Sequence, residues 1–200
     1  MGFSGSAIAG VAAATVLAVS VAGCGARTSP TSSAPSAKST SHSAPASAVQ
    51  PTDYTGLLIQ ATDIKAPDEF KASPPTKNPN GQPGVATTFT TQDGDHLIKD
   101  TILVLADPAA ATKAMNEAKK QRGNEIKKVQ TGSANVGTGA TTLSGNTSDG
   151  SKGVLLLLFT QGRAFVTLEF YGPPHTLPPD DFVNDVGGKQ QAAVKEGLGG

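Results

Sequence analysis

The distribution of apolar positions predicts two kinds of strand toward the C-terminal end of the chain. Residues 154–159 are apolar at every position, a pattern typical of a strand whose two faces are both covered. Residues 164–171 alternate instead, which predicts a strand with one buried face. The alternating apolar positions are Val166, Leu168 and Phe170. A turn sequence, Gln161-Gly162-Arg163, joins the two strands.

Four further segments are strand-like. Residues 85–91 and 97–105 are separated by Gln92-Asp93-Gly94-Asp95, which is a hairpin signal, so we expect these two segments to pair antiparallel. Residues 126–131 and 138–143 are weaker strand candidates.

Two segments have the spacing and the flanking residues of helices. Asp107 and Pro108 place a capping acid and a first-turn proline before an Ala-rich run, which predicts a helix over residues 108–122. One stripe of that helix consists of Ala111, Met115, Ala118 and Arg122. Asp180 is the predicted cap of a final helix that extends to about Lys195. The residues near one face of the final helix are Phe182, Val186, Gln190 and Val194.

The remaining segments complete the predicted domain, residues 53–200. Residues 54–64 carry apolar side chains at mixed spacing, which favours a short helix, and the prolines and glycines of residues 74–84 indicate an irregular loop. A length of about 150 residues is common for one domain. We therefore predict a single α+β domain, with an antiparallel sheet of about six strands and two or three helices packed on it.

Two similar turn sequences raise the question of an internal repeat. Thr91-Gln92-Asp93-Gly94 and Thr147-Ser148-Asp149-Gly150 each precede an apolar strand, and a helix closes each half of the domain. A duplicated hairpin-plus-helix unit is one explanation. Chance is the other, because Asp-Gly turns are common in hairpins.

A different apolar stretch, residues 7–22, leads to the only cysteine of the chain. It has the length of a signal-peptide hydrophobic region and falls short of the roughly 20 residues that span a bilayer. Val21-Ala22-Gly23-Cys24 resembles the lipobox of bacterial lipoproteins. The resemblance implies a signal peptide over residues 1–23, cleavage between Gly23 and Cys24, and a diacylglycerol thioether on Cys24. The protein would then be held on the extracytoplasmic face of the cell membrane by this lipid.

The first residues depart from the usual export signal. Residues 1–10 contain no Lys or Arg, although such signals usually begin with a basic region. Met1-Gly2-Phe3-Ser4-Gly5-Ser6 also fits the N-myristoylation pattern, but the hydrophobic segment and cysteine downstream make export the simpler explanation.

Residues 24–52 have the composition of a tether. After Cys24 the segment is dominated by Ser, Thr, Ala and Pro, and Val49 is its only large aliphatic residue. Such a segment buries too little apolar surface to offset the entropy of ordering. We expect a disordered stalk with a root-mean-square reach of about 30 Å.

Charge and cysteine content exclude some classes of protein. Removing Arg27 and Lys38 from the 16 basic residues leaves 14 against 16 acidic residues in the domain, so nothing favours nucleic-acid binding. No cysteine follows Cys24, and the domain must fold without disulfides.

No group of residues identifies a reaction, a cofactor or a metal site. A nucleophile needs a base within reach, and no Gly-x-Ser-x-Gly pattern accompanies His96 or His175. Asp93, Asp95 and Asp100 have the wrong spacing for a calcium loop, so we interpret them as turn residues and a strand-end acid. We expect no enzyme. A hydrolase built from Asp95, His96 and His175 is the least favoured alternative.

The two proline-rich segments, residues 73–84 and 172–179, are candidates for a partner-binding rim. Prolines reduce the entropy lost on binding, and surface loops often carry recognition. Tyr171 and His175 would give the rim an aromatic face and a titratable group. The alternative is that both segments only connect the sheet to its helices.

The lipobox, the Ser/Thr/Pro stalk and two phrases of the domain together resemble small mycobacterial cell-envelope lipoproteins. The two phrases are Asn80-Gly81-Gln82-Pro83-Gly84-Val85 and residues 162–170. The predicted layout is also similar to the PsbP-like fold and to the extracytoplasmic sensor domains of mycobacterial serine/threonine kinases, although those sensors carry disulfides. The resemblance implies a non-enzymatic binding or sensor-type module of the envelope, with an unknown envelope protein or a lipid as its ligand. A carrier of a lipid or another apolar molecule is the alternative.

Overall fold

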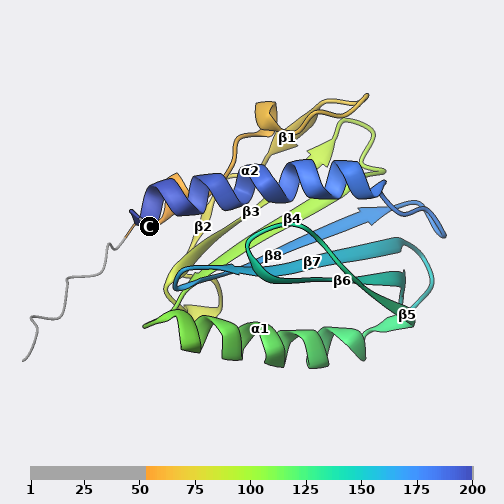
Figure 1. The fold of residues 1–200 in the computed structure, drawn as a ribbon. Coiled ribbons are helices and arrows are strands. Elements are labelled where there is room, and N and C mark those ends of the chain that lie inside the picture. The colour runs from red at the N-terminus through yellow and green to blue at the C-terminus, as the bar shows by residue number, and fades with distance from the viewer. Residues whose placement is uncertain (1–52, 200) are drawn as a thin grey trace, which may run out of the picture. The chain divides into compact units, whose positions relative to one another are not determined.

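The computed structural model describes residues 53–199, an antiparallel sheet with one long helix on each face (Figure 1). The predicted signal peptide, Cys24 and the tether lie outside the described residues. Within residues 53–199, neither helix is both long enough and apolar enough to cross a membrane.

The sheet has eight strands, and its main path runs β1-β3-β4-β8-β7-β6-β5, with β2 also paired to β3. The strands are β1 (Phe70–Ala72), β2 (Thr76–Lys77), β3 (Gly84–Thr91), β4 (Leu97–Val104), β5 (Ile126–Ser133), β6 (Thr138–Thr147), β7 (Gly153–Gln161) and β8 (Ala164–Gly172). All neighbours pair antiparallel. The α+β class is confirmed, and the six predicted strands are present. The short β1 and β2 are additional, because the segment predicted as an irregular loop pairs with β3.

β7 is buried on both faces, as its uninterrupted apolar run predicts. Residues 153–160 are all buried. Leu155, Leu157 and Phe159 belong to the larger hydrophobic core on one face of the sheet. Leu156 and Leu158 belong to a second core on the opposite face. Each face of this strand therefore needs its own cover.

The two long helices provide these covers. α1 (Pro108–Gly123) starts at Asp107, whose carboxylate accepts the N–H of Ala110 at 2.7 Å, and its Ala111 and Met115 are buried in the second core. α2 (Asp180–Leu198) packs on the larger core with the predicted face. A Cβ added at Gly187 would lie 2.6 Å from Leu157 Cδ2, so this glycine allows α2 to approach β7 closely.

The start of α2 differs from the prediction. Pro179 occupies the cap position without a side-chain hydrogen bond, and Asp180 is the first helical residue. The carboxylate that accepts a hydrogen bond there belongs to Asp181, which binds the N–H of Phe182 at 2.9 Å. Asp180 is therefore not the cap, because the extended backbone of Pro179 already sets the entry of the chain into the helix.

Residues 53–64, which we call the strap, form two single turns of 3-10 helix instead of the expected short helix. These turns are η1 (Thr55–Leu57) and η2 (Ala61–Asp63). The strap is bound to α2 by Gln190, a fully buried residue whose amide donates to Leu57 O at 2.6 Å and accepts from Ile59 N at 3.2 Å. Two separate turns replace one helix because Gln190 binds the extended backbone between them.

The two Thr-x-Asp-Gly turns have the same hydrogen bonds. The hydroxyl of Thr91 donates to Asp93 and accepts the N–H of His96, and the hydroxyl of Thr147 donates to Asp149 and accepts the N–H of Lys152. The elements that follow differ: β4 leads directly into α1, whereas β7 leads into β8 before α2. The two helices also cover opposite faces. The similarity is therefore a shared turn, and the structure contains no repeated hairpin-plus-helix unit over residues 53–199.

Asp100 corrects one sequence interpretation. It lies in the middle of β4 and not at a strand end, on the face that also carries Ile98, Ile102 and Val104. The side chain is fully buried, and neither carboxylate oxygen has a hydrogen-bond partner. Burial raises the pKa of Asp100 well above its usual range. The strand-end interpretation is wrong because the sequence does not show whether a single acid within an apolar strand lies on the buried or the exposed face.

We expect Leu156→Ala and Leu157→Ala each to lower the free energy of unfolding by about 2–5 kcal/mol, because each removes a fully packed side chain from a different core. Denaturant unfolding measures the two values. The control Val129→Ala, at a position 41% exposed, should change stability by less than about 0.5 kcal/mol. A large loss at only one of the two leucines would contradict burial on both faces.

We expect Asp100→Asn to become progressively more stable than the native chain as pH rises. A carboxyl with a raised pKa in the folded state costs nothing below its unfolded pKa of 3.8, and the cost grows by about 1.4 kcal/mol per pH unit until the raised value is reached. Thermal unfolding of both proteins from pH 4 upward gives this difference. Asp95→Asn, at an exposed position of the same hairpin, is the control. Parallel stability curves for Asp100→Asn and the native chain would refute the assignment.

Candidate functional site

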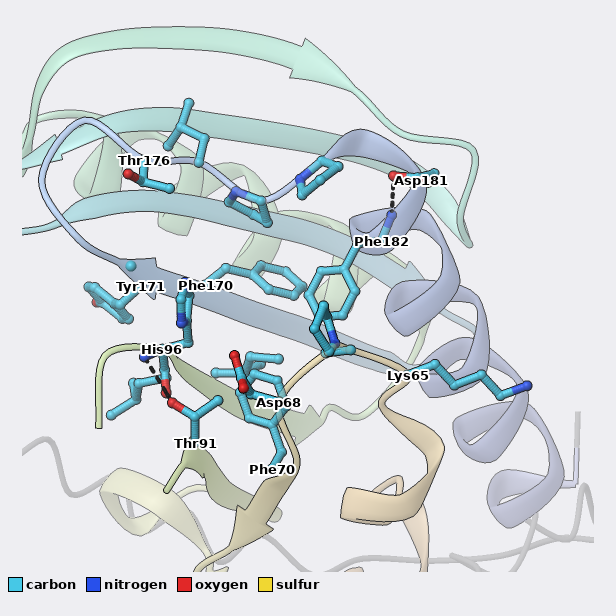
Figure 2. Close-up of a pocket in the computed structure, with 18 residues that line it drawn as sticks. Lys65, Asp68, Phe70, Thr91, His96, Phe170, Tyr171, Thr176, Asp181 and Phe182 are labelled. Carbon is cyan, nitrogen blue, oxygen red and sulfur yellow. Dashed lines mark hydrogen bonds between the residues drawn. The ribbon is translucent and has the colours of Figure 1, made fainter. Parts of the chain in front are cut away.

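A mostly apolar pocket of about 430 Å³ lies on the α2 face, at one end of the sheet (Figure 2). Its floor comes from the start of β4 and the end of β8. One wall is residues 65–70, which follow the strap, and the other is residues 176–182, which lead into α2. A volume of this size is within the range of small-molecule sites, which is about 300–1,000 Å³.

Three phenylalanines and a leucine give the pocket its apolar character. Phe170 and Phe182 meet edge to face, with ring centroids 6.0 Å apart and an interplanar angle of 71°. Phe70 adds a third ring from β1, and Leu177 on the loop before α2 is 42% exposed. An aliphatic side chain of this size exposed beside three aromatic rings is a surface suited to an apolar ligand.

Five titratable side chains line the pocket, and the fifth, Tyr171, is described below. Figure 2 shows the Asp68 carboxylate directed toward the pocket, whereas the ammonium of Lys65 points away from it. Asp181 is engaged at the start of α2 through the N–H of Phe182. The fourth group is His96, whose imidazole lies beside the backbone of Gly172. These polar side chains lie around the apolar floor and can orient a ligand that has one polar end.

The loop between β8 and α2 is held against the sheet by its backbone. Gly153 N–H donates to Pro173 O at 3.1 Å, and Thr176 N–H donates to the same carbonyl at 3.0 Å. A Cβ added at Gly153 would lie 2.1 Å from Thr176 O, so only glycine permits this approach. The loop thereby fixes the pocket wall that starts at Thr176.

Tyr171 lies in a polar cluster near α1. Its hydroxyl donates to Glu169 at 2.5 Å, and Glu169 also binds Arg122 of α1 at 2.6 Å. The ammonium of Lys99 lies 5.1 Å from the Tyr171 ring centroid. Burial, followed by the hydrogen bond to Glu169, raises the pKa of Tyr171 to about 12. The hydroxyl is therefore neutral and occupied by Glu169.

His175 is exposed in the loop, in a left-handed conformation with φ of 62°. Its N–H donates to Asn146 Oδ1 at 3.1 Å. The role of Tyr171 and His175 in partner binding stays a prediction.

The idea that the two proline-rich segments share one rim is wrong. Gly84 pairs with Leu103, and Leu103 pairs with Phe165 at the start of β8. Residues 73–84 approach this end of the sheet, whereas residues 172–179 follow the end of β8 at the opposite end. An antiparallel sheet separates them because β3 and β8 flank β4 and both run in the same direction, so the start of one strand cannot meet the end of the other.

The hydrolase candidates do not assemble as a nucleophile and its base. His96 meets Thr91 through its backbone N–H at 3.1 Å, and the Thr91 hydroxyl donates to Asp93 at 2.7 Å. This hydroxyl bond, the largest contribution, lowers the pKa of Asp93. The second hairpin has the same bonds with Lys152 in the place of His96, so the arrangement belongs to the turn and not to an imidazole.

Sequence reasoning singled out His96, Tyr171 and the segment 172–179, which contribute to the pocket lining, but did not predict residues 65–70 as the opposite wall. Residues 65–70 and 176–182 are separated by more than a hundred positions, and neither carries a motif. No local sequence signal points to this meeting of two distant segments, because a single leucine in a proline-rich loop is common on protein surfaces.

Comparisons with known proteins give a likeness in fold. No family model matches the chain, and no curated protein matches it. The extracellular domain of PknH from Mycobacterium tuberculosis is a similar solved structure, with a TM-score of 0.49, 8% sequence identity, and coverage of 74% of this chain and 95% of that chain.

Proposed function

We propose that this protein is an extracytoplasmic binding module of the cell envelope that takes up a small apolar molecule in the pocket at the end of the sheet. The observation that supports it is the pocket itself, about 430 Å³ of mostly apolar space bounded by Phe70, Phe170 and Phe182. Side chains that are free to pack usually fill such a space. A ligand in the pocket would bury its apolar surface against the floor and against the exposed Leu177.

The proposed activity is binding without chemical conversion. The titratable groups at the pocket are single polar residues at its edge, and the Thr91 hydroxyl is bound to Asp93. An apolar ligand with one small polar group fits this distribution, since the polar group would remain near Asp68 and His96 while the apolar part occupies the floor. Both a carrier and a sensor of apolar molecules could use this mode of binding.

The location follows from the N-terminal sequence. We infer that Cys24 carries a lipid and that residues 25–52 hold the domain at a distance from the membrane. A tether with a reach of about 30 Å would allow the domain to receive molecules from the membrane surface.

We expect the full chain in detergent to bind the neutral fluorescent probe N-phenyl-1-naphthylamine in this pocket. Leu177→Glu should weaken probe binding at least about tenfold, because it places a charge against apolar surface. Val129→Glu is the matched control, since Val129 is 41% exposed and Leu177 is 42% exposed, and Val129 does not line the pocket. Native mass spectrometry of the chain released from detergent measures both affinities, because the fluorescence of this probe would also report its partition into micelles. An absence of probe binding, or an equal loss in both variants, would refute the proposal.

We expect Cys24→Ala to abolish lipidation and signal-peptide cleavage. Mass spectrometry should detect a native product that begins at a diacylated Cys24, and a precursor retaining residues 1–23 in the variant. Globomycin, which blocks the lipoprotein signal peptidase, should leave a lipidated but uncleaved precursor of the native chain. An unchanged product mass in the variant would contradict the lipobox assignment.

A further inference from the structure

Asp100 is the only carboxyl group among the described residues that is fully buried, and the surrounding protein does not compensate it. Its cross-strand partners are Thr87 on β3 and Leu168 on β8. The hydroxyl of Thr87 already donates to Ser73 O at 2.8 Å. A charge on Asp100 would therefore have no partner in the closed structure, and such a charge is costly in an apolar core.

The strap covers this part of the sheet. α2 packs on β7, and the strap contacts α2 on one side and β1 on the other. The strands between β7 and β1 in the sheet include β3 and β4, so the strap lies over the region that holds Asp100. The strap contributes four buried side chains to the same core as Ile98 and Ile102. These side chains are Tyr54, Leu57, Ile59 and Ile64.

The attachment of the strap differs from that of the strands. Its backbone bonds close its own turns, for example Leu57 N–H to Tyr54 O at 3.0 Å. The bonds that join it to α2 include those of two side chains, Gln190 and Lys189, the latter to Asp63 O at 2.7 Å. A segment held in this way can separate from the domain without breaking a strand ladder.

The charged groups of the strap and of the neighbouring turn of α2 have other partners. Asp53 binds Lys77 of β2 at 2.7 Å, Asp63 accepts the N–H of Gln60 at 2.8 Å, and Asp185 of α2 binds Lys189 at 2.6 Å. Tyr54 is the other titratable residue that is buried in the described part of the chain. No cation faces Asp100 from β3 or β8, whose neighbouring residues on this face are uncharged.

We propose that the strap is a pH-gated cover, which lifts from the sheet as Asp100 gives up its proton to water. The closed strap keeps the carboxyl protonated, and the open strap allows water to hydrate the carboxylate. Opening is therefore linked to the release of one proton, and its equilibrium constant rises about tenfold per pH unit. The rise begins near the ordinary pKa of 3.8 and levels off at the raised value.

The position of the strap in the chain gives this opening a consequence. It connects residue 52 of the predicted tether to residues 65–70, which form one wall of the pocket. Opening of the strap would therefore free the N-terminal end of that wall. The inference concerns the cover alone and does not depend on what the pocket binds.

The test is hydrogen–deuterium exchange of the full chain in detergent at pH 4.5, 5.5, 6.5 and 7.5, read by mass spectrometry and divided by the intrinsic exchange rate at each pH. We expect the corrected exchange of residues 53–64 to rise by up to about tenfold per pH unit. β7 exchanges through global unfolding, which also exposes Asp100, so its corrected exchange should show the same pH dependence but stay far slower than that of the strap at every pH. In Asp100→Asn, the pH dependence of the strap should disappear, and Asp100→Leu is a second uncharged substitution with the same side-chain branching. Asp95→Asn is the control and should behave like the native chain.

Three results would overturn the proposal. The first is exchange of the native strap that, after correction, does not change with pH. The second is corrected exchange of the strap that is as slow as that of β7, because the strap would then open only when the whole domain unfolds. The third is a pH dependence of the strap that persists in both Asp100→Asn and Asp100→Leu.

Discussion

The burial of β7 on both faces is the constraint on which the rest of the domain depends. A strand with Leu157 on one face and Leu156 on the other needs two layers of cover, and α1 and α2 provide one each. Gly187 brings α2 close enough to pack on Leu157. Because α2 lies over β7, it leaves the strands toward β1 to be covered by something else, and the strap and the pocket occupy that part of the sheet.

The strap and the pocket therefore both occupy the part of the sheet that α2 leaves uncovered. Over the middle of β4, the strap completes the core with apolar side chains and binds α2 through the buried amide of Gln190. At the end of β4 and β8, residues 65–70 and 176–182 stand apart and enclose about 430 Å³. Asp100 lies beneath the first of these covers, two residues along β4 from Ile98, which lines the pocket. The unpartnered buried carboxyl and the pocket are thus close together in the fold.

The hairpin at Thr91 brings together residue types that are common in catalytic sites, but it does so through the hydrogen bonds of a turn. A threonine, a histidine and an aspartate lie within six residues there, beside a pocket. The same bonds recur at Thr147, Asp149 and Lys152, where the hydroxyl bond to Thr147, the largest contribution, lowers the pKa of Asp149 to about 2. Because His96 and Lys152 each give this turn the same backbone N–H, the bond to the threonine hydroxyl does not require an imidazole.

The sequence by itself determined the six main strands, both long helices, the Asp107 cap and the two-sided burial of residues 154–159, because each rests on a local signal such as periodicity, capping or turn chemistry. The prediction of a lipobox at Cys24 likewise rests only on the order of neighbouring residues. Only the tertiary structure decided where β1 and β2 pair, that residues 73–84 and 172–179 lie at opposite ends, that Asp100 is buried, and that residues 65–70 meet residues 176–182. These features depend on strand order and on the face that each side chain occupies, and no local pattern encodes contacts between segments so far apart in the chain.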